Sequence, residues 1–291
     1  MYYCPWCHSD HHHPYLAVKD HFLSKESFEV LACEQCGLLF TAPRPAPDRI
    51  GSYYESDEYL SHQENKSGLV PTLYEKVKAI NLKNKRNMAL SGLDPGRLLD
   101  IGCGVGDFLR VVKEKNWDVA GIEPSVHAKS IAEKRLGFTP LDPSEAVALE
   151  SSSFDVITMW HVLEHIDDLH RQVDDLHRLL RCGGRLVIAL PNYQSFDATY
   201  YQSAWAAWDV PRHLNHFSPA FLIGALQQNG FKHLDTQGLK WDSYYISYLS
   251  ERYLEHGLPL LRGAWRGWQS NLKAHHSGMY SSLVYRFEKI L

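Results

Sequence analysis

The 291-residue sequence lacks three features that would indicate a membrane-spanning, secreted or nucleic-acid-binding protein. No stretch approaches the roughly 18 consecutive apolar residues of a transmembrane helix. The first residues carry neither the basic start nor the apolar run of a signal peptide. Basic residues are not in excess, since 30 Lys and Arg stand against 34 Asp and Glu, so there is no strong nucleic-acid signature. We therefore expect a cytoplasmic protein whose thiols stay reduced.

Disulfides are thus not expected, yet the sequence contains six cysteines. Four of them form two C-x-x-C pairs with 25 residues between the pairs: Cys4, Cys7, Cys33 and Cys36. Two such turns can supply the four thiolates of a tetrahedral structural Zn2+ site. Strand-like runs at 15–18 and 28–31 lie between the pairs, so residues 1–47 predict a small zinc-ribbon-like module. Two redox pairs, or four unrelated buried cysteines, are the alternative interpretations.

A linker and a helical lead-in are expected over residues 48–95. Three prolines near the end of the module give the chain a stiff, extended exit. A polar segment rich in tyrosine follows, and it includes Tyr54 and Tyr59. A helix is predicted over 72–90. We expect this part of the chain to cover the active site.

From residue 97 onward, buried-strand patterns alternate with helical ones. The strand-like runs cover 97–102, 118–122, 154–160 and 185–190. Repeated β-α-β units give a parallel sheet with helices on both faces. We therefore predict an α/β fold with a Rossmann-like, doubly wound and mostly parallel sheet over 96–245. Such a sheet binds its ligand at the carboxyl ends of the strands.

The first of these strands opens onto a loop with glycine at alternate positions: Gly102, Gly104 and Gly106. Glycine lets a ligand approach the backbone closely. The spacing differs from the dinucleotide fingerprint, and the carboxylates of Asp100 and Asp107 flank the loop. They disfavour a pyrophosphate and favour a ligand with positive charge, such as a sulfonium with an amino-acid tail. Glu123, at the end of the second strand, is suited to accept both hydroxyls of a ribose.

Four motifs in this order resemble the class I S-adenosylmethionine-dependent methyltransferases: 98–106, 121–124, 154–165 and 183–192. The resemblance covers about residues 70–240 and implies that S-adenosyl-L-methionine is the cofactor. It implies the glycine loop under the methionine part, Glu123 on the ribose and Asp142 near the adenine. Trp160 and His161 would flank the cofactor. The cofactor-binding residues implied in this way are Asp100, Gly102, Gly104, Gly106, Glu123, Pro124, Asp142, Trp160 and His161.

The region 193–217 is long, irregular and rich in aromatic residues, which is typical of a lid or a substrate wall. His213 and His216 near its end are the preferred candidates for a general base, because histidine titrates near neutral pH. Arg212 is a candidate for binding an anionic substrate group such as a phosphate. The alternative is that these residues only join the lid to the sheet. His165 is either a residue of the substrate pocket or a loop histidine that caps the next helix.

A four-cysteine unit followed by this domain is similar to sugar-nucleotide C-methyltransferases. In those enzymes an E-H-x-x-x-F-S run follows the last central strands, and here the corresponding run is 212–218. The histidine is kept as His213, whereas Arg212 replaces the carboxylate. This departure puts C-methylation in doubt and leaves a sugar nucleotide or a cell-surface glycan precursor as the expected small polar acceptor. By the same resemblance, Tyr54 and Tyr59 would contact the substrate.

The C-terminal region 246–291 is predicted to be helical. Leu258, Leu261, Trp265, Trp268 and Leu272 recur at three- and four-residue steps, and Leu283, Phe287 and Leu291 continue this pattern. The region 258–291 has five Lys or Arg and one acidic residue. A basic helix with tryptophans on its apolar face is suited to a membrane surface. Packing on the domain, or on a second subunit in a homodimer, is the alternative.

The function predicted from these features is methyl transfer from S-adenosyl-L-methionine to a small polar acceptor, with a histidine as the base. A zinc-ribbon-bearing RNA methyltransferase is the alternative, although the net charge of −4 argues against it. A binding module that has lost its cofactor is a third hypothesis, and the intact glycine loop and Glu123 argue against it.

Overall fold

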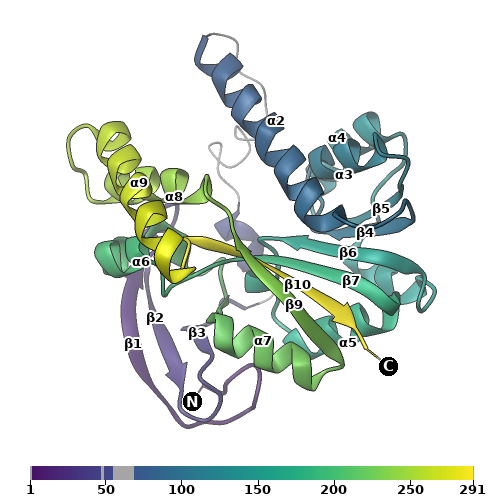
Figure 1. The fold of residues 1–291 in the computed structure, drawn as a ribbon. Coiled ribbons are helices and arrows are strands. Elements are labelled where there is room, and N and C mark those ends of the chain that lie inside the picture. The colour runs from purple at the N-terminus through teal and green to yellow at the C-terminus, as the bar shows by residue number, and fades with distance from the viewer. Residues whose placement is uncertain (1, 47–48, 55–68, 291) are drawn as a thin grey trace.

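The structure is a computed structural model that describes residues 2–46, 49–54 and 69–290. Its strands form two sheets (Figure 1). The larger sheet has six strands in the order β5-β4-β6-β7-β10-β9, and the smaller one has four in the order β1-β2-β3-β8. Among the described residues no helix is long and apolar enough to cross a membrane.

The larger sheet confirms the predicted Rossmann-like α/β domain. Its first four strands, paired in parallel, are β4 (Arg97–Ile101), β5 (Asp118–Ile122), β6 (Phe154–Trp160) and β7 (Leu180–Pro191). The other two are β9 (Phe231–Gly238) and β10 (Ser282–Lys289). Strand β10 lies between β7 and β9 and runs antiparallel to both.

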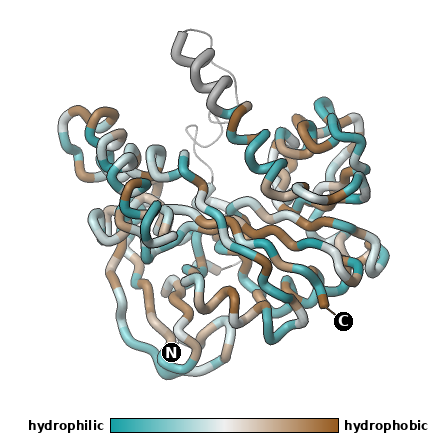
Figure 2. The backbone as a smooth tube through the Cα atoms, viewed as in Figure 1, coloured by the Kyte–Doolittle hydropathy of each residue, from teal (hydrophilic) through white to brown (hydrophobic). Residues whose placement is uncertain are grey.

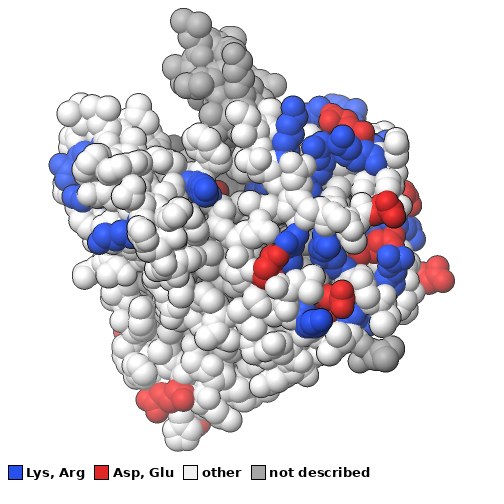
Figure 3. Space-filling model, in the orientation of Figure 1, with Lys and Arg blue, Asp and Glu red and all other residues white. Residues whose placement is uncertain are grey.

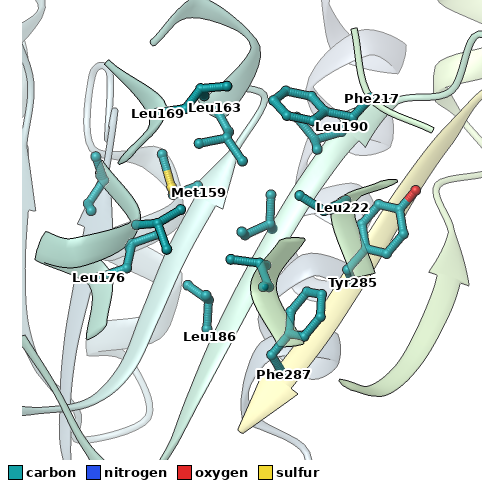
Figure 4. Packing of buried hydrophobic residues seen from close by; sticks show 14 of the residues in the cluster. Met159, Leu163, Leu169, Leu176, Leu186, Leu190, Phe217, Leu222, Tyr285 and Phe287 are labelled. Carbon is teal, nitrogen blue, oxygen red and sulfur yellow. The ribbon is translucent and has the colours of Figure 1, made fainter. Parts of the chain in front are cut away.

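Helices cover both faces of this sheet, because alternate strand residues point to opposite sides. On one face, α5 (Leu169–Leu179) and α7 (Pro219–Gln228) pack against residues such as Met159 and Leu186 (Figure 4). On the other face lie α2 (Leu69–Leu90), α3 (Asp107–Lys113) and α4 (Val126–Leu136). Figure 2 shows the central strands as mainly hydrophobic, as expected for strands buried on both sides.

The N-terminal module contains both predicted strands. They form β1 (His12–Lys19) and β2 (Ser27–Cys33), an antiparallel pair that continues through β3 (Leu39–Ala42). The fourth strand, β8 (Asn215–His216), comes from the aromatic insert and pairs with β3. The module is therefore joined to the large domain through a shared sheet.

The insert 193–217 is folded, which differs from the irregular lid expected from the sequence. It contains α6 (Phe196–Tyr201) and the short 3-10 turns Gln202–Ala204 and Ala206–Trp208. Trp205 and Trp208 are each only 2% exposed and pack with the module residues Phe28 and Val30. The aromatic side chains of the insert thus mainly pack between the two sheets. Their burial there is more favourable than exposure to water.

The prediction that 246–291 is entirely helical is wrong. Helices α8 (Asp242–Tyr253) and α9 (Pro259–Ser277) are present, but 282–289 is the strand β10. Leu283 and Phe287 face one side of the sheet, while Val284 faces the other. A short apolar run fits either a helix or a doubly buried strand, and the position between β7 and β9 selects the strand. The large domain therefore extends to residue 289, beyond the predicted limit of 245.

Candidate active site

The glycine loop lies at the carboxyl end of β4, where its backbone requires residues without a side chain. Gly102, Gly104 and Gly106 all have positive φ, at 72°, 54° and 79°. A Cβ on Gly102 would lie 2.4 Å from Cγ2 of Val162, so that position is closed by packing. A Cβ on Gly104 would meet nothing within 4 Å, which leaves open space beside the backbone. Open space beside a glycine backbone is what we expect where a ligand approaches the loop closely.

Glu123 follows β5 and is held at the neighbouring strand end. Its Oε2 accepts a hydrogen bond from the Gly104 N–H at 2.8 Å, and its Oε1 accepts one from the Ser125 N–H at 2.9 Å. Each carboxylate oxygen has a further lone pair. Glu123 can therefore accept hydrogen bonds from a ribose while it remains fixed by the loop. Pro124 beside it is exposed.

Asp142 lies close to this edge of the sheet, because the preceding Leu141 forms a bridge to Ile122 of β5. No full strand forms at 138–141, in contrast to the expected one. The Asp142 carboxylate accepts hydrogen bonds from the backbone and hydroxyl of Ser144, at the start of the 3-10 turn Pro143–Ala148. These contacts hold the loop at the position predicted for the adenine.

Asp100, Trp160 and Lys85 lie close together near the ends of β4 and β6. Asp100 is 2% exposed, and burial raises its pKa to about 7, although a hydrogen bond from Thr158 and the charge of Lys85 oppose the rise. The ammonium of Lys85 lies 4.9 Å from the ring centroid of Trp160. Asp107 is neutralised by Lys78 and Arg135, so the expectation that its charge acts on the ligand is not met.

His161 is partly buried at the end of β6, between two carboxylates. Its Nε2 lies 3.0 Å from Oδ2 of Asp242, and its Nδ1 lies 3.5 Å from Oε1 of Glu164. Burial alone would lower the pKa of His161, but the two carboxylates raise it to about 9. At neutral pH the side chain is therefore an imidazolium that links β6 to α8.

Glu164 is the main site residue that sequence reasoning missed. Its side chain is almost completely buried, and neither carboxylate oxygen has a hydrogen-bond partner among the described residues. Burial opposes its ionisation, yet three neighbouring histidines hold the pKa of Glu164 below its usual value: His161, His213 and His165. Its place between two histidines in the 161–165 run was the available signal. A buried carboxylate without hydrogen bonds is costly, and the charge of His161, 3.5 Å away, offsets part of that cost.

His213, the preferred candidate for the base, is fixed by one hydrogen bond and lies beside two carboxylates. Its Nδ1–H donates to the carbonyl of Ala207 at 2.9 Å, which leaves the lone pair on Nε2. Nε2 lies 4.0 Å from Oε1 of Glu164 and 3.9 Å from Oδ2 of Asp209. Burial and the charge of His165 lower the pKa of His213 to about 4. The imidazole is therefore neutral at neutral pH.

His165 lies next to His213, with the ring centroids 4.6 Å apart. Its Nδ1 is 2.9 Å from the Arg212 carbonyl and 3.0 Å from the hydroxyl of Tyr54. The alternative role, as a cap for the following helix, is wrong because the Asp168 side chain caps α5. Tyr54 is thus brought to the site, while Tyr59 lies outside the described residues.

His216 is 6% exposed, and its Nε2 lies 3.0 Å from the hydroxyl of Thr41 in β3. Burial lowers its pKa well below the usual value. It does not line the large cavity beside His161 and His213, but it lines a small one together with Glu164 and His213, so its catalytic role stays a prediction. Its contacts join the insert to the N-terminal sheet.

Arg212 also differs from its predicted role as an anion-binding residue. Its guanidinium is nearly buried and forms ion pairs with Asp20 at 2.9 Å and Asp209 at 2.6 Å. A further N–H donates to the carbonyl of Tyr53. Two carboxylates already neutralise the charge, so Arg212 connects the β1–β2 turn, the linker and the insert. A substrate phosphate would have to compete with these carboxylates.

A cavity of about 660 Å³ lies beside His161 and His213, at the ends of β6 and β7. One wall comes from the turn between β1 and β2, with His21, Phe22 and Lys25. The opposite wall is α8, including Tyr245, Ile246, Leu249 and Arg252. Lys85 reaches the same cavity from α2. The space has the size of a small-molecule site. Its lining combines apolar and aromatic side chains with many charged groups of both signs, including the acidic Asp209, Asp242 and Glu255.

The four predicted metal-binding cysteines come together at the opposite end of the N-terminal module. Their Sγ atoms all lie within 4.8 Å of one another, and the Cys4–Cys36 and Cys7–Cys33 distances are 3.5 and 3.4 Å. Tetrahedral Zn–S bonds of about 2.3 Å place sulfurs about 3.8 Å apart, so the cluster fits Zn2+. Trp6 stacks on His170 of α5 with ring centroids 4.4 Å apart, which holds this end of the module on α5.

Among the described residues, a second group has donor atoms within the same distance of one another: Glu164, His165 and His213. In this group Nδ1 of His165 is already engaged by a backbone carbonyl, and His213 uses Nδ1 in the same way. Only the Nε2 atoms of the two histidines therefore remain available to a proton or a cation. The group can share a proton, or hold a cation, with the Glu164 carboxylate.

Comparison with known proteins identifies the family of the large domain. Residues 74–236 match the family described as "Methyltransferase domain". The chain is 30% identical over 123 residues to a demethylmenaquinone methyltransferase of Thermotoga maritima, covering 40% of this chain and 54% of that protein. It is 29% identical over 124 residues to a malonyl-[acyl-carrier protein] O-methyltransferase of Enterobacter lignolyticus, covering 42% and 48%. The chain thus spans about half the length of these curated relatives.

Solved structures with the same fold include the phosphoethanolamine N-methyltransferase 2 of Haemonchus contortus in complex with S-adenosyl-L-methionine. The TM-score is 0.55 at 16% identity, over 96% of this chain and 69% of that one. A geranyl diphosphate methyltransferase gives a TM-score of 0.53 at 15% identity, over 74% and 87%. These similarities concern the fold. Since the family match covers more than half of the chain, the protein belongs to the methyltransferase-domain family of class I S-adenosylmethionine-dependent methyltransferases.

Proposed function

We propose that this methyltransferase acts on a small polar acceptor that loses a proton as it is methylated, namely a sugar nucleotide or a cell-surface glycan precursor. The observation that carries the proposal is His213, whose Nε2 has no hydrogen on it and whose side chain lines the large cavity. A hydroxyl or a carbon acid needs such a base, whereas an amine with a free lone pair does not.

The residues of the cofactor pocket fit S-adenosyl-L-methionine, which supplies a methyl group on a positively charged sulfur. Glu123 would hold the ribose hydroxyls, and the open backbone at Gly104 would lie against the methionine part. Asp100, Asp242 and Trp160 offer carboxylates and a ring face to positive charge, a preference that Lys85 satisfies in this structure. The chain's main contribution at this end is to hold the donor in line with the acceptor.

At the acceptor end, His213 would accept the proton at Nε2 as the new bond to the methyl group forms. Its Nδ1–H bond to Ala207 fixes the ring and the tautomer. The resulting imidazolium would then lie beside Glu164 and Asp209, whose carboxylates favour the charged form. Glu164 and Asp209 are positioning residues in this scheme.

An anionic acceptor is supported by charges at the cavity other than Arg212. Lys25 in the β1–β2 turn and Arg252 of α8 both line it, together with Phe22 and Tyr245. Two cations and two aromatic rings suit a diphosphate attached to a planar base. The N-terminal module would in this way contribute to the acceptor site through its turn, while its cysteine end rests on α5.

The double variant Lys25→Ala with Arg252→Ala is expected to bind uridine diphosphate at least about tenfold more weakly than the wild type, since each charged contact contributes about 1.5–3 kcal/mol. Calorimetric titration measures this, and affinity for S-adenosylhomocysteine should be unchanged. Lys134→Ala, an exposed lysine on α4, is the matched control. Equal binding by the wild type and the double variant would exclude the diphosphate site.

For the cysteine cluster we propose a structural Zn2+ ion. The purified protein should then contain about one zinc ion per chain by elemental analysis. Cys33→Ser should lower the zinc content and the melting temperature together, because the ligands hold the module on α5. Cys182→Ser, at an exposed cysteine outside the cluster, should change neither. A zinc-free wild type with the melting temperature of Cys33→Ser would contradict the assignment.

An RNA acceptor has no comparable support in the structure. On the face of the molecule shown in Figure 3, Lys and Arg are interleaved with Asp and Glu over the region of α3, α4 and the sheet edge. Nucleic-acid binding normally uses a continuous basic surface.

A further inference from the structure

Helix α9 packs on α8 through small residues. Its buried residues are Gly263, Gly267, Ser270 and Ala274, which lie on one side of the helix. A Cβ on Gly263 would be 2.6 Å from Cα of Tyr248, and one on Gly267 would be 2.7 Å from Cα of Tyr244. The two helices are therefore in close backbone contact. The large apolar side chains of α9 are not what holds it in place.

Those side chains lie on the other side of α9, in water. Four of them are 44–65% exposed and lie on one side of the helix: Leu261, Trp265, Trp268 and Leu272. We call this group the α9 stripe. The rings of Trp265 and Trp268 are 4.9 Å apart, so the stripe includes a continuous aromatic patch. An amphipathic helix normally buries such a face, and a contiguous exposed patch of this kind marks an interaction surface.

The charged residues of α9 indicate which kind of surface would bind the α9 stripe. The helix carries Arg262, Arg266 and Lys273 and no Asp or Glu, and of these Arg262 is paired with Glu251 of α8. Arg266 and Lys273 lie over the rings of Tyr200 and Phe196 in α6, along the edge of the helix. A second copy of the chain docked stripe to stripe would bring cations against cations. An anionic surface offers the opposite charge and an apolar layer beneath it.

The position of the helix is compatible with a flat partner. In Figure 1, α8 and α9 form a lobe at one side of the molecule, away from α3 and α4 and from both labelled ends of the chain. Tryptophan and leucine with flanking cations are the residues that insert into the headgroup region of a bilayer. We propose that the α9 stripe docks on an anionic phospholipid surface. The proposal is independent of the methyl acceptor and does not require the proposed function.

Flotation with lipid vesicles tests this. The full-length wild type is expected to float with vesicles of equal parts phosphatidylglycerol and phosphatidylcholine. It should bind vesicles of phosphatidylcholine alone at least about tenfold less, and high salt should weaken the binding, because part of the attraction is electrostatic. The double variant Trp265→Ser with Trp268→Ser should lose at least about tenfold in partitioning.

The control is the double variant Val126→Ser with Val147→Ser, which removes two exposed apolar side chains outside the stripe. It should float like the wild type. Circular dichroism and S-adenosylhomocysteine binding show whether each variant is folded, and neither property should change. Failure of the folded wild type to float would overturn the proposal. So would a wild-type dimer in sedimentation that the tryptophan variant converts to a monomer, since a second copy would then be the occupant.

Discussion

Glu123→Ala should weaken the binding of S-adenosylhomocysteine by about a hundredfold or more. The carboxylate is the group in the pocket with two oxygens available to the two hydroxyls of a ribose, and hydrogen bonds to a charged acceptor contribute about 1.5–3 kcal/mol each. Removing it also takes the acceptor away from the N–H groups of Gly104 and Ser125, so the loop would lose its present geometry. Isothermal titration calorimetry measures the change directly.

The matched control is Glu114→Ala, which removes an exposed carboxylate at the end of α3 that pairs with Arg110 one turn earlier. Its affinity should equal that of the wild type. Glu123→Gln keeps the acceptor on one atom and should fall between the two. Wild-type affinity in a folded Glu123→Ala variant would show that the cofactor binds elsewhere, whatever the acceptor.

His213→Ala should lower kcat by about 10²- to 10⁴-fold, the usual contribution of a general base. Affinity for S-adenosylhomocysteine should remain, because His213 lies on the acceptor side. Since burial and His165 lower its pKa to about 4, the base is unprotonated throughout the neutral range. The rate should therefore be flat across neutral pH and fall only in acid, as His213 takes up a proton. Release of S-adenosylhomocysteine with a panel of sugar nucleotides provides the assay.

The variant Glu164→Gln tests whether His213 acts as a base or has only a structural role. It removes the charge that would stabilise the imidazolium and should lower kcat with little change in KM. His127→Ala, at an exposed histidine of α4, is the control. Loss of wild-type activity in a chelator that leaves the zinc of the cysteine cluster in place, restored by a divalent ion, would instead make His213 a metal ligand. A full rate in a folded His213→Ala variant would exclude it as the base.

Local patterns were sufficient to predict the cofactor side of the site. The positions of Gly102–Gly106 and Glu123 depend on strand ends and on backbone conformations that only certain residues adopt, and both are readable along the chain. The acceptor side depends on contacts between distant segments. Arg212 meets Asp20 across 192 positions, and the local sequence shows only Asp209, three residues earlier, as a partner for its charge.

The C-terminal error has a different origin. Apolar residues at 283 and 287 fit a helical period, but 283–285 also form a continuous apolar run that a doubly buried strand requires. The strand forms because β10 can pair with both β7 and β9. Pairing between segments so far apart along the chain cannot be predicted from the local sequence. Glu164 was missed for a similar reason. Its role depends on its burial and on the three histidines around it, and these are features of the folded structure.

The positions of β8 and β10 have a consequence for how the protein is made on the ribosome. Strand β3 ends at residue 42, but its partner β8 lies at 215–216. Strand β7 ends at residue 191, and its partner β10 is synthesised last, at 282–289. Until these late segments emerge, the nascent chain exposes the edges of two unfinished sheets and their apolar faces. Pairings between such distant segments form slowly. Growing chains of this protein should therefore depend on chaperones that cover strand edges, and slow decoding before residue 215 should lower the yield of folded enzyme.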